Sequence, residues 1–443
     1  MVASLDGDGF DARYEVLAPA ASNRFVLRPV SVQSVGYATW PALDTLAKAP
    51  PLPGLLEKRG GGLVSMDKAT LVAKMRAYLD PAHSFEQARI VNPALGVDRA
   101  GYVARKARPD LLSEGFTPGN VRQFCTSAFD MRWAYTTATP TVWNRVRPPL
   151  LHVLPDAVGF LALRPQQIAD PEGFPAYWTT SLADDRVLHK HGFMVPVIEN
   201  FSGAPRPNLS ETAAAYLAEL GVDPRPASAA MLWHHALATL YSPAYLAENA
   251  GGLRQGWPRV PLPASLAVLQ SSAALGAQLA ALLDPDTAVP NVTTGTLRPE
   301  LACIGVPRTR PGSEKDWELK GWGNRTDEGV TMPLRGRAVP RAYGDAEAAT
   351  SEYASLLGTT MVDVGINDAS FWRGIPETVW ECRIGGYQVL KKWLSYRDHS
   401  IIARPLSAEE VGHVQQVARR VAAVLLLGPA LDASYRDCAL VHH

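Results

Sequence analysis

Apolar positions recur at helical spacing in two segments that also carry capping signals. The spacing predicts a helix over 69–79, and Asp67 stands where its side chain can cap the free amide groups of the first turn. A second, long helix is predicted over 407–427, where Ser407 and Glu410 match the capping-box pattern. The chain is therefore expected to close with a long helix.

The remaining periodic segments predict a protein that mixes helices and strands. Further helices are predicted at 40–46, from 210 onward, and at 229–241, 243–250, 264–283 and 346–357. Short runs bounded by proline and aspartate predict strands at 14–17, 25–30, 134–137, 150–154, 160–163, 193–198 and 361–364. These elements do not follow a regular strand–helix–strand series, so we expect a mixed α/β (α+β) fold, with a mixed sheet, a helical region and a long C-terminal helix.

The same patterns divide the chain into four parts. Residues 1–84 form a linker-like or coupler-like N-terminal segment, which contains a proline- and glycine-rich stretch at 50–62. Residues 85–205 carry the mixed α/β pattern, and residues 206–290 are helical. Residues 291–443 combine a loop-rich lobe, a closing motif and the C-terminal helix.

The charges are balanced, with 43 Lys+Arg and 43 Asp+Glu among 443 residues. This balance argues against a basic coat over the whole surface, but it permits the local basic patch that a duplex reader needs. The four cysteines stand far apart and form no CxxC pair, so neither a zinc site nor a disulfide framework is indicated. The N-terminus lacks the order of a signal peptide, and polar residues interrupt the most membrane-like run, 264–283. We expect a cytoplasmic protein that does not insert into membranes.

The motifs of common catalytic sites are missing from the sequence. We find no Gly-x-Gly-x-x-Gly loop, no P-loop and no Gly-x-Ser-x-Gly elbow. An adenine methyltransferase would need an Asn/Asp-Pro-Pro-aromatic tetrapeptide to grip the extruded base, and the nearest segment, 92–95, lacks the second proline and the aromatic residue. We therefore assign no catalytic residue and no cofactor to this chain.

Histidines offer little support for a metal site. His189 and His191 could bind a metal from one strand, whereas His234 and His235 are neighbours within a predicted helix. Adjacent helical side chains point about 100° apart and do not chelate one ion together. We expect ordinary surface or core histidines and no metal.

Basic residues gather beside aromatic residues in several places. Such clusters lie at 129–133, 143–147, 254–259 and 315–341. Arginine and asparagine can read base edges with two hydrogen bonds, and lysine and arginine neutralise phosphates. Surface arginine is also common in a composition of this kind, so the clusters alone leave DNA binding and an ordinary solvated surface both open.

The segment 380–398 is the most distinctive of the chain. Its two glycines, Gly385 and Gly386, are followed at once by apolar positions that alternate with Lys391 and Lys392. Spacing alone favours a packed helix with a solvated face. A phosphate-contacting element is the alternative, because apolar anchors and cations can serve opposite sides of one short element.

Several segments together resemble the C-terminal specificity region of the Type ISP restriction-modification enzymes. Segments 37–46 and 61–67 resemble the linker that follows the methyltransferase part of that family. Residues 117–135, which include Phe-Asp-Met-Arg-Trp, 241–245 with 257–262, and 371–394 resemble three further motifs, and the last of these matches closely. The resemblance covers about residues 35–435. The chain departs from the family where Ser127-Ala128 replaces Arg-Pro and where Leu246 replaces Arg.

The resemblance implies sequence-specific recognition of double-stranded DNA, by a target-recognition domain whose helices dock an adenine-specific methyltransferase part that this chain lacks. S-adenosylmethionine would then belong to that methyltransferase part. Two alternatives stay open: the chain is part of a methyltransferase enzyme, or it is a protein-interaction scaffold in a phage-defence complex. Residue type and clustering give the candidate DNA contacts Arg132, Asn144, Arg145, Arg147, Arg259, Lys320, Asn324, Arg325, Arg335, Arg337, Lys391, Lys392 and Arg397.

Within that set we expect a division of labour. Base reading would fall to the arginine-rich loops at 315–341, because they combine arginine with asparagine. Lys391, Lys392 and Arg397 would contact phosphates at most, because the regular apolar spacing around them is that of a packed element.

Overall fold

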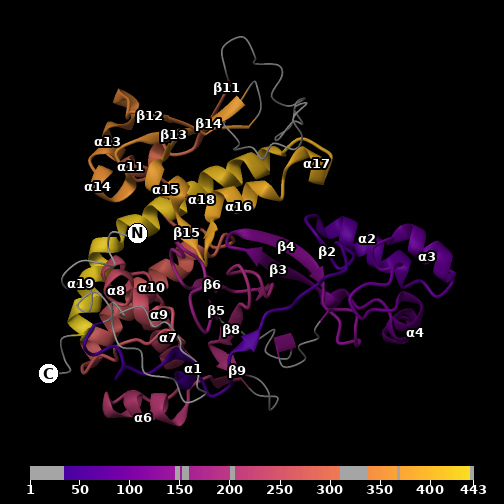
Figure 1. The fold of residues 1–443 in the computed structure, drawn as a ribbon, viewed down its shortest axis with the longest axis horizontal. Helices are drawn as coiled ribbons and strands as arrows, with labels where there is room; N and C mark the ends of the chain where they lie inside the picture. The colour runs from indigo at the N-terminus through magenta and orange to yellow at the C-terminus, as the bar shows by residue number, and fades with distance from the viewer. Residues whose placement is uncertain are drawn as a thin grey trace, which may run out of the picture.

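The computed structural model describes residues 34–144, 150–151, 159–199, 205–309, 338–366 and 370–439. Within them, helices and small sheets alternate in the mixed α/β arrangement that the sequence predicts (Figure 1). The expected strands at 14–17 and 25–30 lie outside the described residues, and so does most of the one expected at 150–154, whose first two residues are helical.

The central helices form one packed group. The group comprises α6 (Glu211–Glu219), α7 (Pro226–Leu240), α8 (Pro243–Glu248), α9 (Ala250–Leu253) and α10 (Leu266–Leu283). Helix α10 is long and apolar enough to cross a membrane by length and composition, but here it packs against α7. The two helices approach so closely that a Cβ on Gly276 would lie 1.8 Å from the carbonyl oxygen of His234. Glycine at this position therefore permits the close approach of the two backbones, and α10 is the core helix that the sequence predicts.

The C-terminal helices α18 (Ala408–Leu426) and α19 (Gly428–Ala439) run along the upper and left edges of this group (Figure 1). The predicted capping box is confirmed, because the Ser407 side chain accepts from the backbone of Glu410 while the Glu410 side chain accepts from the backbone of Ser407. Helix α18 contacts both α10 and the small sheet above it, so it joins the two parts.

Strands form three four-stranded sheets and two pairs among the described residues. The first sheet has the order β2-β4-β3-β7, the second β1-β8-β5-β6 and the third β11-β14-β13-β12; the pairs are β10-β9 and β15-β16. Their bounds are β1 (Leu52–Pro53), β2 (Val64–Ser65), β3 (Val121–Ser127), β4 (Asp130–Tyr135), β5 (Phe160–Leu163), β6 (Tyr177–Thr179), β7 (Leu182–Ala183), β8 (Phe193–Pro196), β9 (Ile198–Glu199), β10 (Arg206–Pro207), β11 (Val306–Thr309), β12 (Ala338–Arg341), β13 (Met361–Gly365), β14 (Ser370–Pro376), β15 (Arg383–Ile384) and β16 (Tyr387–Gln388).

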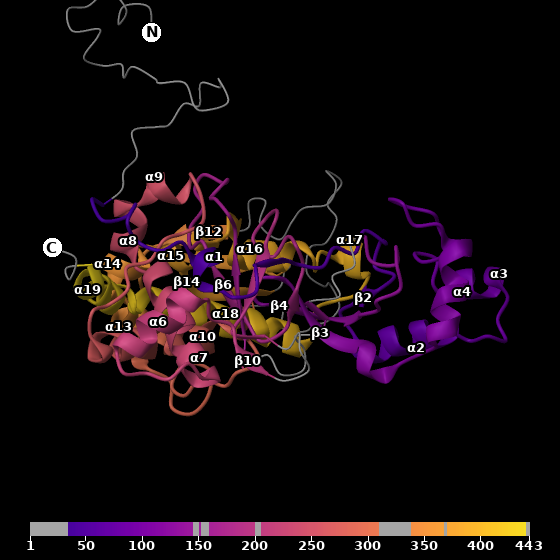
Figure 2. The same ribbon diagram turned by 90° about the horizontal axis from the view of Figure 1, so that it is seen from below.

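A lobe of three helices projects from the body (Figures 1 and 2). It contains α2 (Lys68–Tyr78), α3 (Phe85–Val91) and α4 (Ala104–Glu114). Helix α2 begins as the sequence predicts, because the Asp67 side chain accepts a hydrogen bond from the Thr70 amide. The lobe is joined to the first sheet through α2, which lies next to β2 and β4.

The remaining short helices connect these parts. They are α1 (Leu43–Leu46), the 3₁₀ helices η3 (Pro118–Asn120) and η4 (Asp345–Glu347), α11 (Pro299–Ala302), α13 (Ala348–Ser351), α14 (Ala354–Leu357), α15 (Glu377–Glu381), α16 (Val389–Ser395) and α17 (His399–Ile402). One hydrophobic core cluster extends from Tyr37 to Tyr435 and joins all the large elements. The four-part division of the chain that we drew from the sequence stays a prediction.

Candidate nucleic-acid interface

The double glycine of the closing motif forms the tip of the β15–β16 hairpin. Gly385 and Gly386 have φ angles of 57° and 87°, in the left-handed region that favours glycine. The Gly385 amide donates to the Phe174 carbonyl at 2.7 Å, and a Cβ on Gly385 would lie 2.6 Å from the Cβ of Leu188. The hairpin therefore needs glycine to dock here, and its docking fixes where α16 begins.

Helix α16 has the packed face that its apolar spacing predicts. Its buried side chains are Val389, Leu390, Trp393 and Leu394. On the other side Lys391 is exposed, and the Lys392 ammonium lies 4.3 Å from the ring centre of Tyr387 and 4.4 Å from that of Tyr396. Neither lysine makes an ion pair within the part of the chain that the structure describes. The two charges thus remain available to an anion.

Beside this helix, a buried carboxylate organises two arginines. Asp130 accepts hydrogen bonds from the Thr126 hydroxyl at 2.7 Å, from Arg132 Nη2 at 2.7 Å and from Arg397 Nη2 at 2.8 Å. Burial alone would raise the pKa of the Asp130 carboxyl, but the charges of Arg397 and Arg132 lower it well below its usual range. The carboxylate therefore stays ionised, and it holds the Arg132 guanidinium 4.4 Å from the ring centre of Tyr396.

The two arginines differ in what they can reach. Arg397 is 5% exposed, lies 3.6 Å from the ring centre of Trp393 and is bound to Asp130, so it holds β4 to the end of α16. This corrects our expectation that Arg397 contacts a phosphate, because its charge is already neutralised away from solvent. Arg132 keeps 16% of its side chain exposed and borders a groove, so it remains a candidate.

The groove in question lies between β3, β4 and the loop before β2, and it has a volume of about 290 Å³. Its charged and aromatic lining residues are Glu57, Lys58, Phe124, Arg132, Asp184, Arg186 and Tyr396. Glu57 is occupied, since it accepts from the amides of Gly61 and Leu63. Burial raises the pKa of Asp184 to about 7, so this carboxyl is partly neutral near neutral pH. The groove, which we call the basic groove, thus has the unpaired cations Lys58 and Arg186 and the Asp130-paired Arg132 against the carboxylate of Glu57 and the partly neutral Asp184.

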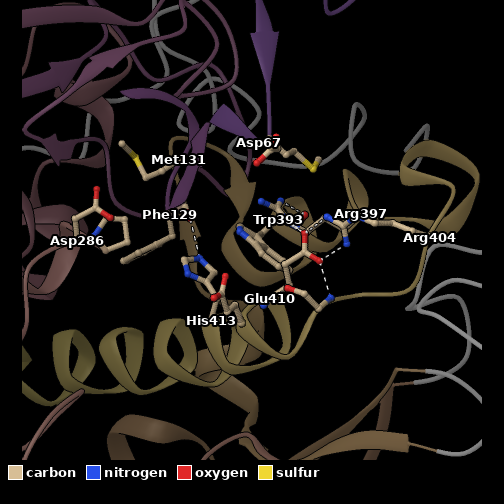
Figure 3. A pocket seen from close by; sticks show the side chains of 13 residues that line it. Asp67, Phe129, Met131, Asp286, Trp393, Arg397, Arg404, Glu410 and His413 are labelled. Carbon is tan, nitrogen blue, oxygen red and sulfur yellow. Dashed lines mark hydrogen bonds and ion pairs between the residues drawn. The ribbon is translucent and has the colours of Figure 1, made fainter. Parts of the chain in front are cut away.

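A second hollow, of about 370 Å³, lies on the other side of Trp393 (Figure 3). Trp393 stacks on His413, with ring centres 5.0 Å apart, and His413 Nε2 lies 2.9 Å from the Phe129 carbonyl oxygen. Burial lowers the pKa of His413 to about 4, so the ring is neutral at pH 7. The carboxyls in its lining are Asp67, Asp286, Glu409 and Glu410, and they outnumber the two arginines Arg397 and Arg404. The lining of this hollow therefore has more acidic than basic side chains.

Two other candidate contacts lie apart from α16 or at the margin of the described structure. The Arg259 guanidinium donates to the Trp40 carbonyl at 2.6 Å and so holds the N-terminal segment against the helical group. Asn144 is half-buried, and its backbone amide donates to the Leu56 carbonyl. It is the last described residue before the gap at 145–149. Arg259 is thus a structural residue in this fold, whereas Asn144 stays a candidate.

Seven predicted contacts lie outside the described residues, namely Arg145, Arg147, Lys320, Asn324, Arg325, Arg335 and Arg337. Five of them belong to the segment 310–337, which connects β11 to β12 at opposite edges of the third sheet. The role of all seven stays a prediction.

The residues considered for catalysis have structural tasks. The buried Asn92 side chain donates to the Gly62 carbonyl at 3.0 Å, so it does not form a base-gripping tetrapeptide. His235 is fully buried, and its ring nitrogens lie 2.8 Å from the Ser272 hydroxyl and 2.8 Å from the Pro261 carbonyl oxygen. Among the described residues no group of three His, Cys, Asp or Glu side chains is placed to hold a metal.

Sequence reasoning missed three residues that line the basic groove. Lys58, Arg186 and Tyr396 were not selected as contacts, because they come from three segments that only the fold brings together. A local signal existed for the orienting carboxylate, since Asp130 and Arg132 alternate on one face of a strand.

The chain was compared with known proteins. A model of the Type ISP C-terminal specificity domain matches residues 53–415. No curated protein matches.

Three solved structures share the fold. They are a nuclease-deletion mutant of the Type ISP restriction-modification enzyme LlaGI in complex with a DNA substrate mimic (12% identity, TM-score 0.56), a DrdV–DNA complex (16%, 0.58) and the ATP-dependent Type ISP restriction-modification enzyme LlaBIII bound to DNA (12%, 0.60). They cover 95%, 94% and 97% of this chain, which in turn covers 36%, 40% and 26% of theirs. The chain thus spans less than half the length of each of these proteins. Since the family model covers most of the sequence, this chain belongs to the family of Type ISP C-terminal specificity domains.

Proposed function

We propose that this chain recognises a target sequence in double-stranded DNA for a Type ISP-like restriction-modification system. The observation that carries the proposal is a set of four cations, Lys58, Arg186, Lys391 and Lys392, that make no ion pair within the described residues. Of these, Lys392 lies against the rings of Tyr387 and Tyr396. Three neighbours in fold, of low sequence identity, were solved with DNA, which supports the same class of ligand.

In this proposal, phosphate contacts and base contacts come from different parts of the chain. Lys58, Arg186 and Lys392 would contact the backbone and set the register of the protein on the duplex. Base edges would be read by Asn144 and by the arginines and asparagine of the segment 310–337. Each good two-bond contact of this kind would discriminate against a wrong base by about 1–3 kcal/mol.

Catalysis would come from another part. An adenine-specific methyltransferase domain or subunit would bind S-adenosylmethionine and act on the base that this chain selects, and the pair would serve phage defence in the cytoplasm. The sequence supports this division, because it offers neither a cofactor loop nor the base-gripping tetrapeptide.

Selection from a pool of duplexes with a randomised core tests the proposal. The chain should enrich one sequence, and log Kd for that duplex should rise linearly with log salt, with a slope of about 0.9 for each phosphate contacted. The Lys58→Gln/Arg186→Gln variant should weaken binding and reduce that slope by about 2. Arg436→Gln is the matched control, because it removes an exposed charge from the distant helix α19.

Other outcomes favour the alternatives. Absence of binding to any duplex at low salt would refute DNA recognition and favour a protein-interaction scaffold. Transfer of a labelled methyl group to DNA by this chain alone would show instead that it is itself an enzyme.

A further inference from the structure

The turn at 184–192 is held in an unusual conformation against the tip of the β15–β16 hairpin. His189 and His191 have φ angles of 76° and 55°, which cost about 1–3 kcal/mol each for residues other than glycine. The Tyr387 hydroxyl donates to the His189 carbonyl at 3.4 Å, and the two rings lie 5.2 Å apart. The contacts with Tyr387 hold His189 beside the hairpin, and the exposed Lys190 follows it in the chain.

On the α16 side, the hairpin borders a hollow of about 330 Å³. Its lining residues are Arg383, Gly386, Tyr387, Gln388, Lys391, Lys392 and Ser395. Three of these side chains are cations, two more carry hydroxyls and one an amide, and none is a carboxylate. Within the described residues, none of the three cations makes an ion pair. A hollow lined in this way suits an oxyanion.

The neighbouring carboxylates are already engaged. Glu172 accepts from the amides of Ile168 and Ala169 and is ion-paired with Arg164. Glu381 accepts from the Gln388 side chain at 3.3 Å. Glu172 is therefore neutralised by Arg164, and Glu381 makes no ion pair with the cations of the hollow.

Buried nitrogen atoms without hydrogen-bond partners also favour an anion near this hollow. The Arg164 side chain is 3% exposed, and its Nε and Nη1 find no hydrogen-bond partner among the described residues. The same holds for the buried Nδ1 of His189. Burial first, and then the charges of Arg164, Lys190, Lys392 and Arg186, lower the pKa of His189. The charges of four cations thus act on one imidazole, and a bound anion would offset their effect on its pKa.

We propose that this hollow, between the β15–β16 hairpin and α16, is a phosphate-binding site whose direct ligands are Arg383, Lys391 and Lys392. The proposal deepens the proposed function, on which it rests for the source of the phosphate, namely one backbone position of the duplex. His189 does not line the hollow, but the charge of Lys392 acts on its imidazole, so the titration of His189 reports a charge bound beside Lys392. A phosphate bound here would fix the hairpin and α16 on the duplex and so set the register of the basic groove.

Two probes test the site, inorganic pyrophosphate and the selected duplex. Calorimetry should show pyrophosphate binding to the wild-type chain, and Arg383→Gln/Lys391→Gln should weaken it about a hundredfold, because each charged hydrogen bond is worth about a factor of ten. The same variant should reduce the salt slope for the duplex by about 2. Arg436→Gln should change neither, and circular dichroism should show that all variants keep the fold.

A second readout follows His189 itself. In chains labelled with ¹³C-histidine, pyrophosphate should move the imidazole titration of His189 to higher pH, and the signal is assigned with His189→Gln. An unmoved titration, with pyrophosphate binding unchanged in the double variant, would overturn the site.

The two proposals fail in different ways. Duplex binding with an unaltered salt slope in Arg383→Gln/Lys391→Gln would overturn the phosphate site and leave DNA recognition standing. Pyrophosphate binding that the variant abolishes, without binding of any duplex, would uphold the site for a free phosphate compound and refute DNA recognition.

Discussion

The strongest test of the architecture is the substitution Asp130→Asn. The Asp130 carboxylate is fully buried and lies between two guanidinium groups, those of Arg132 and Arg397, at 2.7 and 2.8 Å. The amide keeps the shape of the side chain and removes the charge, so both arginines lose the Asp130 carboxylate as an ion-pair partner. Breaking a buried pair in this way costs about 3–5 kcal/mol. We expect about 3, because Arg397 keeps a second carboxylate, Glu410 Oε1, at 3.6 Å.

Urea denaturation measures this loss as a fall in the free energy of unfolding. Asp223→Asn is the matched control, because it breaks an ion pair with Arg225 in which both side chains are more than 70% exposed. Such a pair contributes about 0–1 kcal/mol. The pKa of Asp130 lies below its usual range, so its contribution is fully present above the unfolded pKa and is lost only as the pH falls through the folded one. A loss of less than 1 kcal/mol at pH 7 for Asp130→Asn would refute the view that this carboxylate joins β4 to α16.

Three further outcomes follow from the geometry. Gly385→Ala should lower the free energy of unfolding by about 1–3 kcal/mol, because the new Cβ would meet Leu188 and the positive φ is strained for alanine. Gly412→Ala in α18 is the matched control: its Cβ has open space, and it should raise the free energy of unfolding by about 0.5–1 kcal/mol. Urea denaturation of both variants measures the two changes. His235 has its pKa lowered to about 4 by burial, so its contribution to stability should be lost as the pH falls from about 6.5 to 4, and His235→Gln should flatten that part of the pH profile of unfolding. Asp184 has its pKa raised to about 7, so the wild type should lose stability as the pH rises from about 4 to 7, by at most about 4 kcal/mol; thermal unfolding of Asp184→Asn should show this loss removed, and an unchanged profile would contradict the assignment.

Local signals predicted much of the helical structure. Asp67 and Ser407 start α2 and α18 as expected, because capping depends on residues within one turn. Helix α4 was missed, since it has no side-chain cap and carries Pro109 in its interior, where proline normally ends a helix. The parallel pairing of β3 with β7 was also out of reach, because their separation in the chain leaves no local trace.

The candidate interface was likewise predictable only in part from the sequence. The packed face of α16 and the exposure of Lys391 follow from spacing, and both are found in the structure. The burial of Arg397 does not follow from spacing, because its partner Asp130 is 267 residues away in the sequence. A cation can be judged available only once the acids around it are known, and these come from distant segments.

The presence of an arginine is an uncertain guide to DNA binding, because several arginines of this chain serve inside the fold. Three arginines are buried and serve as multiple donors to backbone carbonyls, namely Arg59, Arg108 and Arg420. A guanidinium suits this task because its five N–H groups point in fixed directions within one plane. A lysine ammonium is more strongly hydrated and tends to stay at the surface.

Lysines without carboxylate partners are therefore the more informative signal in this chain. Lys391 is exposed, and the charge of Lys392 lies beside two tyrosines rather than beside an acid. The zero net charge of the sequence is compatible with a basic surface for the same reason. Acids such as Asp130 and Glu172 are used inside the fold against arginines, and the acidic hollow beside Trp393 faces a different side of α16. The proposed recognition depends on where unpaired charges lie, and three of them, Arg383, Lys391 and Lys392, lie around the hairpin that the two glycines allow to form.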